Sequence, residues 1–196
     1  MNCSLELGRA FGLSDVKGNM APGRVSMKRP QNGFSLIELL IVVAIILIIA
    51  AIAIPNLLRS RMAANESSAV SSVRTINTAE VTYSATFGIG YATLTDLSTP
   101  AAGCPGSGGT PTAACLIDNV LGGGTKSGYT ITATPSNGAG TMASPYVSFN
   151  TGAQPVALGL AGQRSFCSDE SGVIRFDITG APPPAACGSS GLPTLQ

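Results

Sequence analysis

The clearest candidates for chemistry in this sequence are six consecutive residues near the N-terminus, Gly33-Phe34-Ser35-Leu36-Ile37-Glu38. Gly33 offers an extended, accessible backbone without a side chain, which suits a peptide bond that a protease has to reach. Glu38 directly precedes a run from Leu39 to Ile54 that contains no polar side chain. A carboxylate is costly in such a stretch, so Glu38 is a candidate functional residue.

The apolar run predicts a helix that is long enough to cross a membrane. About 22 residues at about 1.5 Å per residue give roughly 33 Å, which matches a bilayer core of about 30 Å. Lys28 and Arg29 stand just before the run. Basic residues tend to remain on the cytoplasmic side, so we expect the C-terminus to lie outside. The run is too long for an ordinary secretory signal and has no small-residue cleavage site behind it.

The same residues carry a resemblance to a known family. The block from Gly33 to Glu38, after a short basic stretch and before an apolar helix, resembles the processing site of a type IV prepilin. Pro55 also lies where that family often has a helix-bending proline. The resemblance extends from Met27 to about Phe87. The family includes major pilins, minor pilins and the pseudopilins of type II secretion.

The resemblance implies that residues 1–33 are a leader, cut between Gly33 and Phe34 by an inner-membrane prepilin peptidase, and that Phe34 is N-methylated. It also implies that Glu38 pairs with the Phe34 ammonium of a neighbouring subunit, because pairing offsets part of the desolvation of a buried charge. Polymerisation would use a platform protein, a cytoplasmic ATPase and, in two-membrane bacteria, a secretin. Residues 1–26 show no clear period, and we expect translation to begin at Met27.

The composition argues against several other functions. The chain has 196 residues, with 11 Lys plus Arg, 10 Asp plus Glu and no His. Without His, the commonest general base and the commonest metal ligand are both missing, so we expect no enzymatic activity, metal or cofactor. No basic patch large enough for nucleic-acid binding is visible. Residues 122–127 lack the glycine that a phosphate-binding loop needs directly before its lysine.

The cysteines predict disulfides outside the cytoplasm. Cys3 precedes the cleavage point, and four cysteines follow it: Cys104, Cys115, Cys167 and Cys187. An even set in a domain that crosses the membrane indicates two disulfides. Four cysteines allow three pairings, of which the nearest-neighbour set, Cys104–Cys115 and Cys167–Cys187, is favoured. Zinc is disfavoured because neither pair has C-x2-C spacing.

A long helix must position the N-terminal residues. Residues 34–55 are expected to form the membrane or filament-core part, and residues 56–87 an amphipathic continuation that ends at Gly88. The apolar row at steps of three and four is Val70, Val73, Ile76, Ala79 (or Glu80), Tyr83 and Phe87. The polar face is expected to consist of Arg59, Arg61, Glu66, Arg74 and Glu80.

Residues 88–196 are expected to form a globular head. A long helix followed by a head with antiparallel strands makes the fold class α+β. Period-two alternation and turn residues predict three or four antiparallel strands packed on the helix. The expected strands are 129–134, 146–150, and a hairpin of 163–168 with 172–177. Residues 88–127 are expected to be mostly loop with one helical turn at 94–97, and the tail from Gly180 to be irregular and tied back by Cys187. This arrangement is the pilin fold that the resemblance implies.

The favoured function is a structural subunit of a type IV pilus, stored in the inner membrane and polymerised into a surface filament for adhesion or motility. A type II secretion pseudopilin or a minor pilin is the close alternative. An unprocessed single-pass anchor that carries a small binding domain is the alternative from another class.

Overall fold

The protein is described by a computed structural model that covers residues 33–100, 103–104 and 108–195. The leader, the proposed start at Met27, and Cys3 therefore lie outside the described residues, apart from Gly33. The chain divides into two compact units, residues 1–43 and residues 44–196. Helix α1, Leu36–Phe87, begins in the first unit and continues through the second.

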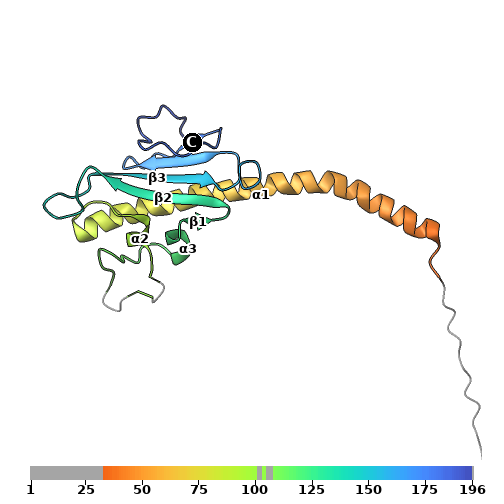
Figure 1. Cartoon of the computed structure of the whole chain (residues 1–196), viewed down its shortest axis with the longest axis horizontal. Helices are drawn as coiled ribbons and strands as arrows, with labels where there is room; N and C mark the ends of the chain where they lie inside the picture. The colour runs from red at the N-terminus through yellow and green to blue at the C-terminus, as the bar shows by residue number, and fades with distance from the viewer. Residues whose placement is uncertain (1–32, 101–102, 105–107, 196) are drawn as a thin grey trace, which may run out of the picture. The chain divides into compact units, whose positions relative to one another are not determined.

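The second unit contains a five-stranded antiparallel sheet in the order β1-β2-β3-β4-β5 (Figure 1). The strands are β1 (Thr125–Lys126), β2 (Tyr129–Ser136), β3 (Ser148–Pro155), β4 (Ser165–Asp169) and β5 (Arg175–Asp177). The predicted α+β class is confirmed, and the predicted hairpin is present as β4 and β5. The additional strand, β1, pairs with β2 across Ser127 and Gly128, both of which have positive φ, as a two-residue hairpin turn requires.

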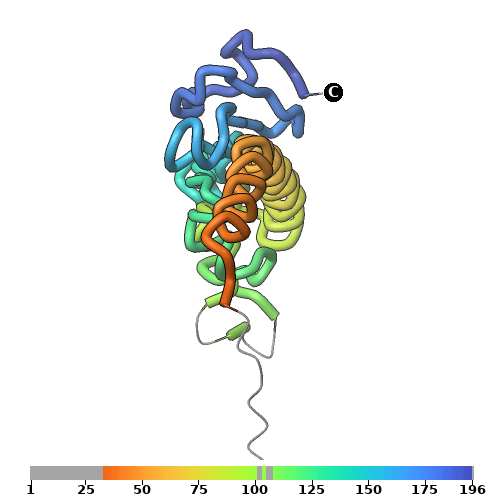
Figure 2. The backbone as a smooth tube through the Cα atoms, turned by 90° about the vertical axis from the view of Figure 1, so that its right-hand side faces the viewer, coloured from red at the N-terminus to blue at the C-terminus, as the bar shows by residue number. Residues whose placement is uncertain are grey.

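The second half of α1 lies along this sheet and supplies one side of the core (Figures 1 and 2). The predicted apolar row is confirmed, since five of its members are buried: Val70, Val73, Ile76, Ala79 and Tyr83. Phe87 is partly buried against the same core. Tyr129, Ile131 and Phe166 of the sheet belong to the same cluster and are almost fully buried. Gly88 then ends α1 with a φ of 69°, as expected for a helix C-terminus.

Two contacts fix which end of the sheet lies near which part of α1. The Asn65 side chain donates a hydrogen bond to the Ala161 carbonyl, 2.9 Å away, in the connection between β3 and β4. In the connection between β2 and β3, the Tyr146 N–H donates to the Ile89 carbonyl, just past the end of α1, at 3.1 Å. The β3–β4 connection therefore lies at the end of the sheet nearest the apolar part of α1.

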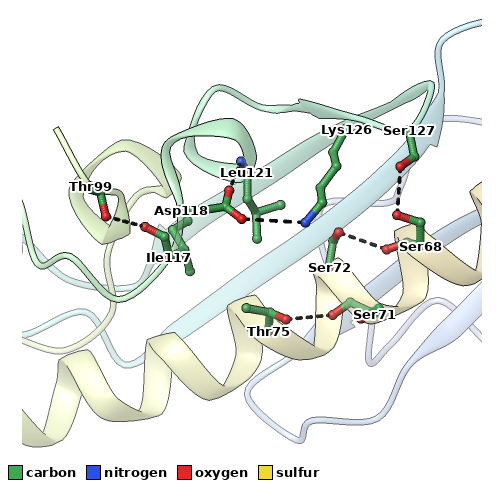
Figure 3. A network of polar contacts seen from close by, with 10 residues as sticks. All are labelled: Ser68, Ser71, Ser72, Thr75, Thr99, Ile117, Asp118, Leu121, Lys126 and Ser127. Atoms are coloured by element: carbon green, nitrogen blue, oxygen red, sulfur yellow. Dashed lines mark hydrogen bonds and ion pairs between the residues drawn. The ribbon is translucent and has the colours of Figure 1, made fainter. Parts of the chain in front are cut away.

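Two short helices, α2 (Leu94–Leu97) and α3 (Asn119–Gly122), precede the sheet. The helical turn at 94–97 is confirmed, whereas α3 was not predicted. Asp118 caps α3 by accepting a hydrogen bond from the Leu121 N–H at 2.6 Å, and it pairs with Lys126 at 3.8 Å (Figure 3). The hydroxyls of Ser68 and Ser127 lie 2.9 Å apart and join α1 to the β1–β2 turn. Asp118 was the capping signal from which α3 could have been expected.

The second unit contains two disulfides, and both join the nearest-neighbour cysteines. Cys104 and Cys115, with Cα atoms 6.0 Å apart, close a loop between α2 and α3. Cys167 of β4 joins Cys187, with Cα atoms 5.8 Å apart. Because Cys187 is fully buried, this second bond holds the irregular C-terminal tail against the sheet.

Candidate functional site

The peptide bond between Gly33 and Phe34 is freely accessible. Residues 33–35 have no regular structure, and α1 begins at Leu36. A Cβ added to Gly33 would meet no atom within 4 Å, and Phe34 is 84% exposed. This geometry is what a protease substrate needs, and cleavage with N-methylation of Phe34 stays a prediction.

Glu38 lies in the first turn of α1, three residues after Ser35, whose carbonyl accepts the Leu39 N–H at 3.2 Å. A carboxylate in a first helical turn interacts favourably with the unpaired N–H groups there. Glu38 is exposed and forms no ion pair within the described part of the chain. Its pairing with the Phe34 ammonium of another copy stays a prediction.

From Leu39 to Ile54 the side chains of α1 are apolar on every side of the helix and have no cover. From Leu36 to Leu58 every Leu, Ile and Val is exposed. Within the described residues, α1 is the single helix long and apolar enough to cross a membrane, and none of its 18-residue window with mean hydropathy 3.3 is buried. So large an uncovered apolar surface requires lipid or other protein as its surroundings. The helix continues unbroken through Pro55, and a bend there stays a prediction.

The expected polar face of α1 was wrong at Glu66, which is buried rather than solvated. Its carboxylate accepts hydrogen bonds from the backbone N–H groups of Gln163 and Arg164, at 2.9 and 3.3 Å. It also forms an ion pair with the Arg164 guanidinium at 2.7 Å. Burial by itself would raise the pKa of Glu66, but the hydrogen bonds and the Arg164 charge outweigh it, so the pKa is lowered. Glu66 therefore joins α1 to the start of β4.

The same expectation was wrong at Glu80, which is fully buried. Its Oε2 accepts a hydrogen bond from the Ala92 N–H at 2.8 Å, and its Oε1 has no partner among the described residues. Burial raises the pKa of Glu80 to about 7 against the opposing effect of the Ala92 hydrogen bond, and the nearby Asp96 charge raises it further. Glu80 thus attaches the segment after α1 to the helix, and its alternative place beside Ala79 in the apolar row was the sequence signal for its burial.

Glu66→Ala is expected to lower the free energy of unfolding of the second unit by about 2–3 kcal/mol. The change leaves two backbone N–H groups and the Arg164 guanidinium without their acceptor, and unsatisfied buried groups of this kind are costly. Urea unfolding in detergent, followed by near-ultraviolet circular dichroism of the buried tyrosines, measures the loss. Glu170→Ala, which removes an exposed glutamate, is the control. A loss no larger than in the control would contradict this role of Glu66.

The described residues contain no group of three or more His, Cys, Asp or Glu side chains that could hold a metal ion. Asp169 and Asp177 each accept hydrogen bonds within their own turns, from Ser171 and Thr179 respectively.

Comparisons with known proteins concentrate on this N-terminal segment. Residues 28–54 match the family described as "Prokaryotic N-terminal methylation motif". The type IV major pilin protein PilA of Myxococcus xanthus is 48% identical over 61 residues, 31% of this chain and 28% of that protein. The type IV wide pilus major component PilA4 of Thermus thermophilus is 63% identical over 38 residues, 19% of this chain and 29% of that protein. No solved structure matches.

The match thus spans less than a third of each relative, and it falls on the segment where the processing motif precedes an exposed apolar helix. The fold of the described residues, a long N-terminal helix packed on an antiparallel sheet, agrees with this similarity. The chain therefore has the prokaryotic N-terminal methylation motif, and the segment around it is similar to that of two type IV pilus proteins, as the sequence resemblance had indicated.

Proposed function

We propose that this chain is a structural subunit of a type IV pilus and has no enzymatic activity. One observation carries the proposal: a prokaryotic N-terminal methylation motif leads directly into a helix whose apolar side chains are exposed on all sides. Such a helix suits lipid before assembly and the packed interior of a filament afterwards. The names of the two relatives, both major pilus components, favour a major pilin over a minor pilin or a pseudopilin.

In this proposal the subunit is stored in the inner membrane with its C-terminus outside. The basic residues Lys28 and Arg29 support that orientation. Prepilin peptidase removes residues 1–33, and Phe34 becomes the N-methylated first residue. A platform protein, an ATPase and, in two-membrane bacteria, a secretin then move the helix from lipid into the filament. The globular head remains at the surface, where an oxidising environment suits its two disulfides.

Glu38 has an assembly role in this proposal. A free ammonium at Phe34 exists only after cleavage, and Glu38 is the one acid between Gly33 and Leu58. Low surrounding dielectric strengthens the attraction between the two charges, and pairing offsets part of the desolvation that both groups undergo in an apolar filament core.

The protein in sheared filaments is expected to begin at Phe34 and to carry one added methyl group. Intact-mass measurement distinguishes this product from the full chain and from a chain that starts at Met27. A mass that includes Lys28 would contradict processing and would favour the unprocessed membrane anchor instead. Electron microscopy of a strain that lacks this chain then separates a major subunit, whose loss removes the filaments, from a minor one.

A further inference from the structure

Exposed apolar side chains gather at the end of the sheet nearest the apolar part of α1. Three lie in the β3–β4 connection, Val156, Leu158 and Leu160, with exposed fractions of 64, 59 and 73%. Ile178, just after β5, is 73% exposed. The two turns touch, since a Cβ added to Gly180 would collide with the Leu158 side chain. We call Val156, Leu158, Leu160 and Ile178 the apolar rim.

The loop that carries most of the apolar rim is held firmly. Three backbone hydrogen bonds of 2.9 Å close it and attach it to the sheet: Val156 N–H to Gly128, Gly159 N–H to Gly162, and Ala161 N–H to Ala157. The bond from Asn65 to Ala161 also attaches it to α1. The exposed leucines therefore belong to an ordered loop rather than to a loose segment.

The loop is attached to α1 a few ångströms beyond the thickness of a lipid headgroup layer, counted from the end of the apolar run. Asn65, which holds the loop, follows the last exposed leucine of α1, Leu58, by seven residues. At about 1.5 Å per residue, this separation is about 10 Å along the helix. A bilayer is about 30 Å thick in its hydrocarbon core and about 40–45 Å with headgroups, which leaves roughly 5–8 Å of headgroups on each side. When Leu58 lies at the edge of the hydrocarbon, the attachment point is therefore a few ångströms outside this layer, a gap that a long apolar side chain of the loop can span.

Two arginines occupy the intervening stretch of α1. Arg59 and Arg61 are exposed, and neither forms an ion pair within the described residues. Two positions apart on a helix, they project about 200° apart, so they face opposite sides of α1. A guanidinium binds phosphate through two parallel hydrogen bonds and keeps its aliphatic stem on apolar surface. Asp177, the acid that precedes Ile178 in the chain, already accepts two hydrogen bonds from Thr179, at 2.7 Å each.

We propose that the apolar rim rests in the headgroup layer of the membrane that α1 crosses, while Arg59 and Arg61 bind lipid phosphates on either side of the helix. This inference rests on the proposed membrane storage of the subunit. The head would then be held against the bilayer surface before assembly rather than move freely at the end of α1. Moving the subunit into a filament would break this contact.

A lipid surface fits the apolar rim better than a second copy of the chain does. The rim is attached to α1 at Asn65, shortly after Arg59, Arg61 and the exposed apolar run. That run needs lipid before any second copy is present. The second half of α1 in another copy has no free acid to offer the arginines. Of the acids on the second half of α1, Glu66 is already paired with Arg164, and Glu80 is fully buried.

The chain contains no tryptophan, so a single introduced tryptophan can report on this contact. The full chain carrying Leu158→Trp is placed in vesicles of phosphatidylethanolamine and phosphatidylglycerol with acyl chains brominated near the headgroup. Interfacial side chains enter the boundary between headgroups and acyl chains by about 5–10 Å, which is the depth of the bromine, and bromine quenches only at short range, so we expect an approximately twofold loss of emission. The control is Met142→Trp, in the β2–β3 connection at the other end of the sheet, where Met142 is 81% exposed. Its emission should not change.

Flotation of the same vesicles separates this inference from the proposed function. If the chain does not float with the vesicles, membrane storage itself fails. If it floats but Leu158→Trp is not quenched, or Met142→Trp is quenched equally, the inference is overturned and storage stands. If the Leu158→Trp side chain is shielded from solvent in filaments but is not quenched in vesicles, the rim contacts a second copy. That result also overturns the inference. Replacing phosphatidylglycerol by phosphatidylcholine, which has no net charge, should reduce the quenching of Leu158→Trp. Adding Arg59→Gln and Arg61→Gln should remove this difference. Equal quenching in both lipids, or a difference that persists in the double substitution, would overturn the phosphate contact.

Discussion

Glu38→Ala is expected to be cleaved after Gly33 like the wild type and yet to yield almost no surface filaments. The scissile bond lies outside α1 in an open, irregular segment, and Glu38 is not needed to expose it. In an apolar filament core, however, the change leaves the Phe34 ammonium of each neighbour without a partner. Breaking a buried ion pair in this way costs about 3–5 kcal/mol. That loss corresponds to more than about a hundredfold weaker subunit addition.

The experiment expresses Glu38→Ala in a strain that lacks the wild-type chain. Cleavage is followed by immunoblot and filaments by electron microscopy, with Glu170→Ala, an exposed glutamate of the head, as the matched control. Normal filament numbers would remove Glu38 from assembly. Uncleaved protein would instead assign Glu38 to recognition by the peptidase. Co-expression with the wild type should rescue some incorporation, because only some of the pairs are then lost.

The contribution of Glu80 to the free energy of unfolding of the second unit is expected to be largest below about pH 4.5. It should be lost as the pH rises through about 7. Burial raises the folded-state pKa of Glu80 from 4.5 to about 7. The folded state therefore binds the Glu80 proton more tightly than the unfolded state does. A difference of this size is worth about 3 kcal/mol between these two pH values. Well above pH 7 both states are ionised, and this contribution to the pH dependence is flat.

Glu80→Gln should remove this slope, because the amide keeps an oxygen for the Ala92 N–H but cannot ionise. The variant should therefore gain about 2–3 kcal/mol relative to the wild type between pH 4.5 and pH 8. Urea midpoints across this range, read from the near-ultraviolet signal of the buried Tyr83 and Tyr129, measure the difference. Glu170→Gln is the control and should keep the wild-type slope. An unchanged slope in Glu80→Gln would show that another group titrates.

Local pattern determined much of this protein from the sequence alone. The processing motif, the apolar run and the amphipathic continuation predicted one helix from about residue 34 to 87, and α1 spans Leu36–Phe87. Helices and hairpins are specified by neighbours a few residues apart, so the periods of α1 and β2 and the β4–β5 turn could be recognised without tertiary information. The nearest-neighbour cysteine pairs present in the structure also close short loops.

Tertiary structure alone decided what holds the buried glutamates of α1. The helical period gave Glu80 an alternative place in the apolar row, but it cannot show which glutamate will meet a donor from a distant segment. Glu66 is buried because Gln163 and Arg164, 97 and 98 residues away in sequence, bring N–H groups and a guanidinium to it. The apolar rim has the same origin. The antiparallel order of β2, β3 and β4 places the β3–β4 connection beside Asn65, and this order follows from strand pairing across the whole sheet rather than from any local stretch.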